Sequence, residues 1–155
     1  MREMRAGEVF LGEKSIGVSG AAAVGAALPG SSVTTLNLGG NKISDEGCGA
    51  IAAKLPGSSV TELYLYDNEI GNEGAKALAS ALEGNGVLTN LSLFGNAIGD
   101  EGAAAIGEAL RDNGVLDTLN LDYNGIGDEG AAAIGEALRG NRSEEHTSEL
   151  QSQPG

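Results

Sequence analysis

A unit of 27 or 28 residues recurs along this chain, and the repeat constrains the fold more than any other feature of the sequence. Its clearest segments are "LNLGGNKI", "LYLYDNEI", "LSLFGNAI" and "LNLDYNGI", which begin at residues 36, 63, 91 and 119. A weaker copy, "VFLGEKSI", precedes them and has Lys14 at the position of the asparagine. One such unit cannot bury its own apolar face, so its neighbours must cover it. The sequence therefore predicts a solenoid of about five stacked units, the first of them degenerate.

Within each unit the residue pattern predicts a strand, a turn and a helix. The L-x-L segment alternates with period two, which is typical of a strand with one buried face. The asparagine that follows turns the chain, and we expect its amide to bond backbone groups of its own turn and of the neighbouring one. These asparagines form a predicted structural ladder: Asn41, Asn68, Asn96 and Asn124.

The second half of each unit has the spacing of an amphipathic helix. In the fourth unit, "GDEGAAAIGEAL", the predicted inward positions follow helical periodicity: Gly102, Ala105, Ile106 and Leu110. A polar residue opens each helix, where we expect it to cap the first turn of that same helix: Asp45, Asn72, Asp100 and Asp128. The predicted fold is α/β, with a curved parallel sheet on the concave side and helices on the convex side.

The consensus L/V-x-x-L-x-L-x-x-N-x-I, carried by four full copies, resembles the leucine-rich repeat family over about residues 8–140. The 28-residue unit with a true helix resembles the ribonuclease-inhibitor type. This resemblance implies a protein-binding scaffold, as in those inhibitors and in the sensor arms of NOD-like immune receptors. Ran GTPase-activating proteins share the repeat, which implies an alternative role as a GTPase activator. No residue here matches an activating arginine, and a purely structural spacer arm is the third hypothesis.

The outward strand positions are the candidate binding surface, because all five aromatic residues of the chain fall among them. Exposed aromatic side chains on one rigid face favour protein binding. Acidic residues beside them predict a partner with a basic patch. The predicted binding residues are Glu62, Tyr64, Tyr66, Asp67, Phe94, Asn120, Asp122 and Tyr123. The competing hypothesis is that Tyr66 and Phe94, on adjacent strands, stack on each other only for stability.

Composition and motifs argue against most other functions. A formal net charge of −13 disfavours nucleic-acid and membrane partners. "GIGDEG" has dinucleotide-type glycines, but its acidic residues would repel a pyrophosphate, and "DYNGIGDEGAAA" lacks oxygen ligands at two calcium-loop positions. We therefore expect no enzyme activity, catalytic residue, cofactor, metal or small-molecule ligand. Cys48, the single cysteine, favours a reducing, cytoplasmic location and is interpreted as a small helix residue.

The last residues differ from the rest of the chain. "RSEEHTSELQS", residues 142–152, resembles the translation of one reading frame of a widely used DNA sequencing adapter. The predicted organisation is an N-terminal extension at 1–7, a leucine-rich repeat domain at 8–141 and a disordered, non-native tail at 142–155. The hypothesis is that the chain is a fragment of a longer repeat protein, truncated at both ends.

Overall fold

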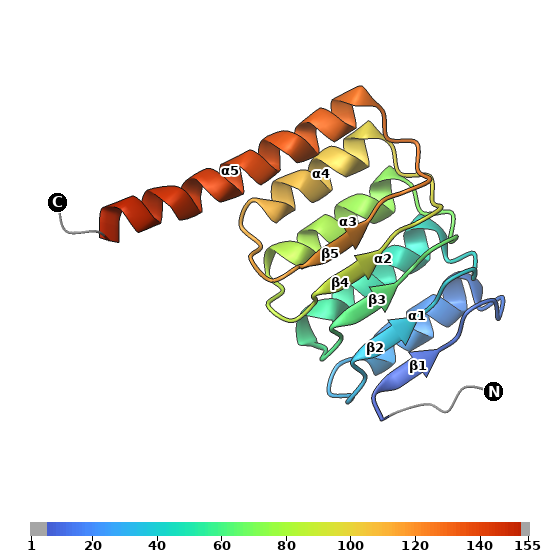
Figure 1. Ribbon diagram of the computed structural model, residues 1–155. Coiled ribbons are helices and arrows are strands. Elements are labelled where there is room, and N and C mark those ends of the chain that lie inside the picture. The colour runs from blue at the N-terminus through green and yellow to red at the C-terminus, as the bar shows by residue number, and fades with distance from the viewer. Residues whose placement is uncertain (1–5, 153–155) are drawn as a thin grey trace.

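Five strand–turn–helix units stack side by side in a computed structural model that describes the backbone of residues 6–152 and the side chains of residues 6–140. Strands form one layer and helices the other (Figure 1). The strands are β1 (Glu8–Phe10), β2 (Thr35–Asn37), β3 (Glu62–Tyr64), β4 (Asn90–Ser92) and β5 (Thr118–Asn120). The helices are α1 (Gly17–Ala27), α2 (Ser44–Lys54), α3 (Asn72–Glu83), α4 (Asp100–Leu110) and α5 (Asp128–Ser152), with a short 3-10 helix η1 (Leu55–Gly57) after α2.

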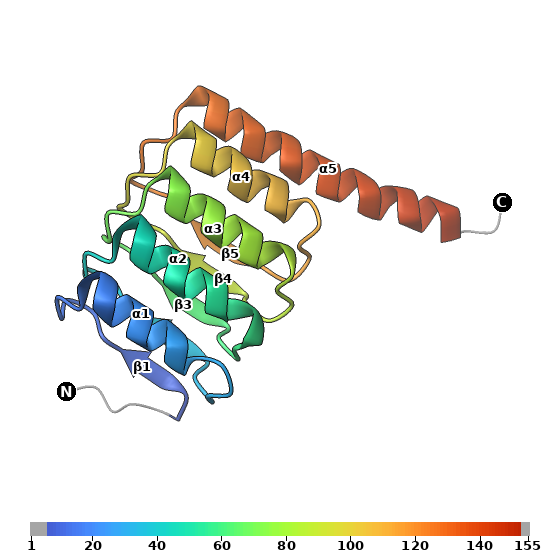
Figure 2. The same cartoon turned by 180° about the vertical axis from the view of Figure 1, so that it is seen from behind.

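The sheet is parallel and its strands follow chain order, β1-β2-β3-β4-β5. The register joins residues of equal position in successive units: Leu36 pairs with Leu63, and Leu63 with Leu91. Every connection passes through a helix on the same side of the sheet (Figure 2). The predicted α/β solenoid of five units is confirmed, and the degenerate first unit lies at one end of the stack.

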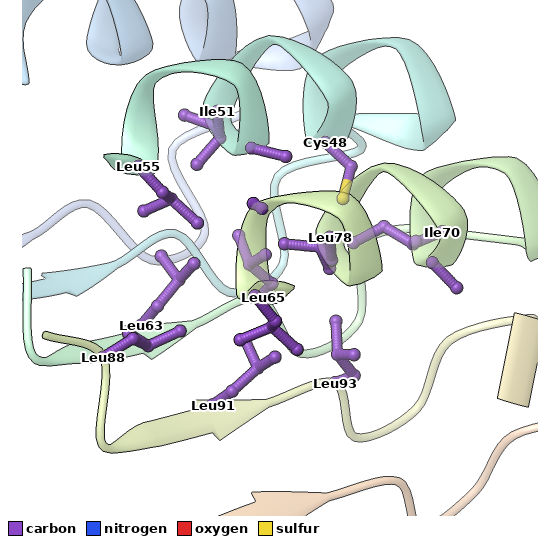
Figure 3. Close-up of a cluster of buried hydrophobic side chains, with 14 of the residues drawn as sticks. Cys48, Ile51, Leu55, Leu63, Leu65, Ile70, Leu78, Leu88, Leu91 and Leu93 are labelled. Atoms are coloured by element: carbon purple, nitrogen blue, oxygen red, sulfur yellow. The ribbon is translucent and has the colours of Figure 1, made fainter. Parts of the chain in front are cut away.

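The core lies between the strand layer and the helix layer. Leu63, Leu65 and Leu91 point from their strands toward α2 and α3, where they meet Ile51 and Leu78 (Figure 3). All five of these side chains have no exposed surface. Alternation along the strand thus places every second residue in the core, as period two requires.

The helices bury more than the one stripe that their periodicity predicts. In α4, Gly102 and Ile106 are buried as expected, but Ala105 and Leu110 are only partly buried. Ala103, Gly107 and Ala109 are buried in addition. The reason is that α4 packs against two neighbouring helices as well as the sheet. A Cβ atom at Gly107 would lie only 3.3 Å from the carbonyl oxygen of residue 133 in α5, so small residues permit close helix contact.

The ends of the chain are described only in part. The expected extension at 1–7 falls mostly outside the described residues, as do residues 153–155 of the expected tail. Helix α5 continues to Ser152 and projects past the body of the stack (Figure 1), although disorder is expected from residue 142. The adapter-like origin and the domain boundaries stay predictions. Within 6–152 no helix combines the length and apolar character needed to cross a membrane.

Candidate functional site

The surface opposite the core is formed by alternate strand residues and the residues just after each strand. We call it the strand face and define it by four positions in each unit: 8, 10, 12 and 13; 35, 37, 39 and 40; 62, 64, 66 and 67; 90, 92, 94 and 95; and 118, 120, 122 and 123. Leu63 and Leu65 are fully buried, whereas Glu62, Tyr64 and Tyr66, which alternate with them, are partly exposed. The eight predicted binding residues all lie on this face.

The asparagines lie behind the strand face and join each unit to the preceding one. The Asn96 Oδ1 accepts hydrogen bonds from the backbone N–H of Asn68 at 2.9 Å and of Ile70 at 3.0 Å. Its Nδ2 donates to the carbonyls of Leu65 and Leu93, both at 3.0 Å. In the same way, Asn68 Oδ1 accepts from two backbone N–H groups of unit two, and Asn41 Oδ1 accepts from two of unit one. The backbone N–H groups from which Asn68 and Asn96 accept belong to residues with no exposed surface, so these amides satisfy donors that water cannot reach and hold successive turns in register.

Lys14, at the corresponding position of the first unit, has a side chain that cannot accept such bonds. Its own backbone N–H donates to Asn41 Oδ1 at 2.9 Å, so the second unit holds the first turn. The ladder therefore runs backward along the chain, from each asparagine to the unit before it.

The polar residues that open the helices join units in the opposite direction. Asp45 Oδ1 accepts from the backbone N–H of Gly71 at 2.7 Å and of Gly74 at 2.8 Å, which lie at the N-terminus of α3 rather than of its own α2. Asn72 bonds the start of α4, and Asp100 bonds the start of α5, with the same geometry. The prediction that these residues cap their own helices is wrong, because helices α2, α3 and α4 have no side-chain cap of their own.

Two aromatic groups occupy the strand face. The Phe94 and Tyr123 rings are 5.1 Å apart with an interplanar angle of 56°, a tilted pair. Tyr66 instead covers Gly39 of the neighbouring unit, where any Cβ would overlap its ring. The competing hypothesis, that Tyr66 stacks on Phe94, is not met among the described residues, because the Tyr66 ring lies over Gly39 on the β2 side and Phe94 pairs with Tyr123. Tyr123 is 80% exposed, the largest exposed fraction of any large hydrophobic residue in the described part.

Carboxylates share the strand face with these rings. Glu62 accepts a hydrogen bond from the Thr35 hydroxyl at 3.0 Å. Burial, and then the Glu62 carboxylate, raise the pKa of the Tyr64 hydroxyl, so Tyr64 remains a neutral donor. Asp67 and Asp122 are exposed at the ends of their strands. Over the twenty positions of the strand face there are five acidic residues and no Lys or Arg, which makes the face electrically negative.

Asn120 has a local structural role. Its Oδ1 accepts from the Asp122 backbone N–H at 2.9 Å, and Asn37 makes the same bond to Gly39 in the second unit. The side-chain oxygen of Asn120 therefore shapes the strand end, and its amide N–H groups donate no side-chain hydrogen bond within the described residues.

Other reactive groups do not form a site. Burial, reinforced by Asp45, raises the pKa of the Cys48 thiol to about 12, and its Sγ donates to the Gly74 carbonyl at 3.5 Å. A neutral thiol is a poor nucleophile. Among the described residues no three His, Cys, Asp or Glu side chains gather closely enough to hold a metal ion.

Comparisons with known proteins agree with this architecture. A family model described as "Leucine Rich repeat" matches residues 31–52, 58–79, 84–107 and 110–135. The solved structure of leiomodin-1 actin-binding site 2 is 25% identical, with a TM-score of 0.73 over 95% of this chain and 87% of that one. The tropomodulin C-terminal domain of Caenorhabditis elegans is 16% identical, with a TM-score of 0.70 over 94% and 89%, and shows a shared fold. No curated protein matches the chain.

Proposed function

Because this chain belongs to the leucine-rich repeat family, we propose that it is a non-enzymatic scaffold that binds a protein partner through its strand face. The observation that carries the proposal is the composition of that face. It holds every aromatic residue of the chain and five carboxylates, without a basic residue. Aromatic anchors supply contact area at low entropic cost, and the carboxylates select a partner with a basic patch.

The core of the proposed contact is the Phe94–Tyr123 pair. Tyr123 exposes 80% of its surface, and an apolar partner group would remove this area from water. Asp122 stands beside Tyr123 in the sequence, and Asp67 belongs to the unit before Phe94. A Lys or Arg side chain of the partner would lie over the rings and pair with a carboxylate. Tyr64 and Glu62 extend the surface toward the middle of the sheet.

Actin is the first specific partner to test, because the leiomodin-1 segment that this chain resembles is named for binding it. Filament co-sedimentation measures this directly. The wild-type protein is expected to sediment with the filaments, and the double variant Phe94→Ala/Tyr123→Ala should bind about 30-fold more weakly if it removes roughly 2 kcal/mol. Glu108→Ala is the matched control, since Glu108 is exposed on α4 and pairs with Arg111, the residue that follows the end of α4.

A lysine- and arginine-rich peptide tests the charge selection separately. Asp67→Asn and Asp122→Asn should weaken its binding and reduce the salt dependence. Equal affinity of wild type and these variants would contradict the role of the acidic residues. Circular dichroism establishes that every variant is folded. If the double aromatic variant binds each partner as wild type does, the strand face is not the binding surface.

A GTPase activator and a spacer arm make different predictions. Arg111 and Arg139 pair with Glu108 and Glu136 on their own helices, on the side away from the strand face. An activator would accelerate GTP hydrolysis by a purified small GTPase, and a spacer would neither do this nor bind a partner. We further propose that the protein is of the ribonuclease-inhibitor type, that it works in the reducing cytoplasm, and that the chain is a fragment of a longer repeat array.

A further inference from the structure

Tyr123 differs from the other two tyrosines of the chain in its exposure. It is 80% exposed, whereas Tyr64 and Tyr66 are only partly exposed. The Tyr66 ring lies over Gly39, and its hydroxyl reaches toward Gly12, where a Cβ atom would lie 3.6 Å from the oxygen. Tyr64 belongs to β3 itself. Tyr123 is therefore the tyrosine that a second protein reaches most easily.

The exposure of Tyr123 follows from its position in the repeat and not only from its place in the last unit. Its counterpart in the middle unit is Asp67, which is exposed although a unit lies on each side of it. Its counterpart in the first unit is Glu13, which is exposed as well. Neighbouring units on both sides are thus compatible with an exposed side chain at this position.

The backbone at Tyr123 adopts a left-handed conformation. Its φ is +57°, and φ is +68° at Gly40 and Gly95, which hold the same position in units two and four. Glycine adopts this conformation readily, whereas it is uncommon for a bulky residue. The turn alone would therefore favour glycine, and the tyrosine is better explained by what its side chain contacts. Residues in such conformations cluster at functional sites.

The segment around Tyr123 is open and acidic. Residues 121–127 form neither helix nor strand, and no Lys or Arg occurs between Arg111 and Arg139. Within six positions of Tyr123 the exposed acidic residues are Asp117, Asp122, Asp128 and Glu129. An enzyme with a basic substrate groove would be attracted to this segment.

A phosphate on Tyr123 would find no cation on the strand face of its own molecule. The twenty positions of that face contain no Lys or Arg. Arg111 and Arg139 pair with Glu108 and Glu136 on the side away from it. A phosphotyrosine carries a charge of about −1.5 to −2 at pH 7 and three strong acceptor oxygens. The counter-charge for this phosphate would therefore come from another protein.

We propose that Tyr123 is a phosphorylation site and that its phosphate strengthens the docking of a basic partner on the strand face. In the transfer, the Tyr123 phenolic oxygen forms a bond to the γ-phosphorus of ATP held by a protein tyrosine kinase. The bond from that phosphorus to the β–γ bridging oxygen breaks, and ADP leaves. The phenolic proton passes to the carboxylate base of the kinase. The docking role rests on the proposed function of the strand face, whereas the modification site does not.

The first experiment treats the full chain with MgATP and a panel of purified tyrosine kinase domains, beside a synthetic peptide of residues 116–130. Mass spectrometry of the digested chain should place one phosphate on Tyr123. Tyr123→Phe keeps a ring beside Phe94 and should abolish the labelling, whereas the double variant Tyr64→Phe/Tyr66→Phe should retain it. Circular dichroism establishes that both variants are folded.

Three results would overturn the modification site. They are equal labelling of Tyr64 or Tyr66 in the folded chain, labelling of the peptide without labelling of the folded chain, and labelling of neither by every kinase of the panel.

The second experiment compares the phosphorylated and unmodified chains in binding a lysine- and arginine-rich peptide. Phosphorylation should raise the affinity about 10-fold at low salt, and the gain should shrink as salt is added. Equal or weaker binding after phosphorylation would overturn the docking role and leave the proposed function standing. Binding by the phosphorylated chain alone would support the docking role and contradict the proposed function of the unmodified face.

Discussion

Removing the Asn96 amide should destabilise the protein more than removing the equivalent amide at the end of the stack. Asn96→Ala deprives the N–H groups of Asn68 and Ile70 of their acceptor. Both donors lie in residues with no exposed surface. An orphaned buried donor costs roughly 1–3 kcal/mol, so the two together should cost about 2–4 kcal/mol once the turn relaxes enough to give one of them partial access to water.

Asn124→Ala is the matched control because it removes the same group in a less buried unit. Asn124 Oδ1 accepts from the Ile98 N–H at 3.0 Å, and its Nδ2 donates to the carbonyls of Leu93 and Leu121. Asn96 and Asn124 are both partly exposed, but Asn124→Ala orphans one backbone donor, whereas Asn96→Ala orphans two. We expect a cost of about 1–2 kcal/mol for this variant.

Urea unfolding followed by circular dichroism and tyrosine fluorescence measures both variants. The free energy of unfolding is obtained from linear extrapolation, with coincident transitions as the check on two-state behaviour. Asn96→Asp retains the acceptor oxygen and loses the donors to Leu65 and Leu93, so it should fall between wild type and Asn96→Ala. A cost for Asn96→Ala no larger than that for Asn124→Ala would refute the inference that buried turn groups depend on this amide.

Three further changes test the contacts between units. Asp45→Ala should lower the free energy of unfolding, measured with urea, by about 1 kcal/mol, as loss of a helix cap does. Asp45→Asn should lower it much less, because asparagine also caps helices. Equal losses in the two variants would contradict the capping role of Asp45. Folding raises the pKa of the Cys48 thiol from 9.0 to about 12. Between these pH values the unfolded thiol releases its proton and the folded thiol does not. The free energy of unfolding should therefore fall as the pH rises from 9.0 toward 12. Cys48→Ala should remove this part of the loss of stability at alkaline pH. If the free energy of unfolding depends on pH in the same way in wild type and Cys48→Ala, the reasoning is refuted. Gly39→Ala should displace the Tyr66 ring and shift its NMR resonances, whereas Gly49→Ala, with open space around it, should leave them in place.

The fold could be predicted from the sequence because every unit repeats the same residue pattern. The L-x-L spacing fixes which strand face is buried, and the constant period brings Leu36, Leu63 and Leu91 into one register. A single unit would leave strand and helix boundaries open to several interpretations. Four copies with the same spacing are compatible only with the stacked arrangement, because any other arrangement would expose the same leucines in every unit.

The direction of the polar contacts could not be predicted from spacing. An aspartate at the first turn of a helix satisfies the pattern of a cap whether it bonds its own helix or the next one. The deciding quantity is the distance between adjacent helix starts, which places Asp45 Oδ1 at 2.7 Å from Gly71 N. That distance follows from the small residues at the helix contacts, and it is visible only once the units are stacked.

The contacts of the aromatic side chains could not be predicted from the sequence for a related reason. Equal positions on adjacent strands predict that Tyr66 meets Phe94, but a side chain in a central unit has two neighbours. On the β2 side stands Gly39, and the space left by its absent Cβ admits the Tyr66 ring. Phe94 then pairs with Tyr123 on its other side. A glycine opposite an aromatic residue is the sequence feature that indicates this choice.

The two ladders differ in direction, and this difference distinguishes the two ends of the stack. Asparagines bond backward to the preceding unit, whereas Asp45, Asn72 and Asp100 bond forward to the following helix. The first unit has Lys14 where an asparagine would bond backward, so its sequence does not hold an earlier turn. The last unit retains Asp128, the forward acceptor, without a donor among the described residues. Among the described residues, the side chain that would bond across a unit boundary is therefore missing at the β1 edge, where Lys14 stands, and retained at the β5 edge, where Asp128 stands.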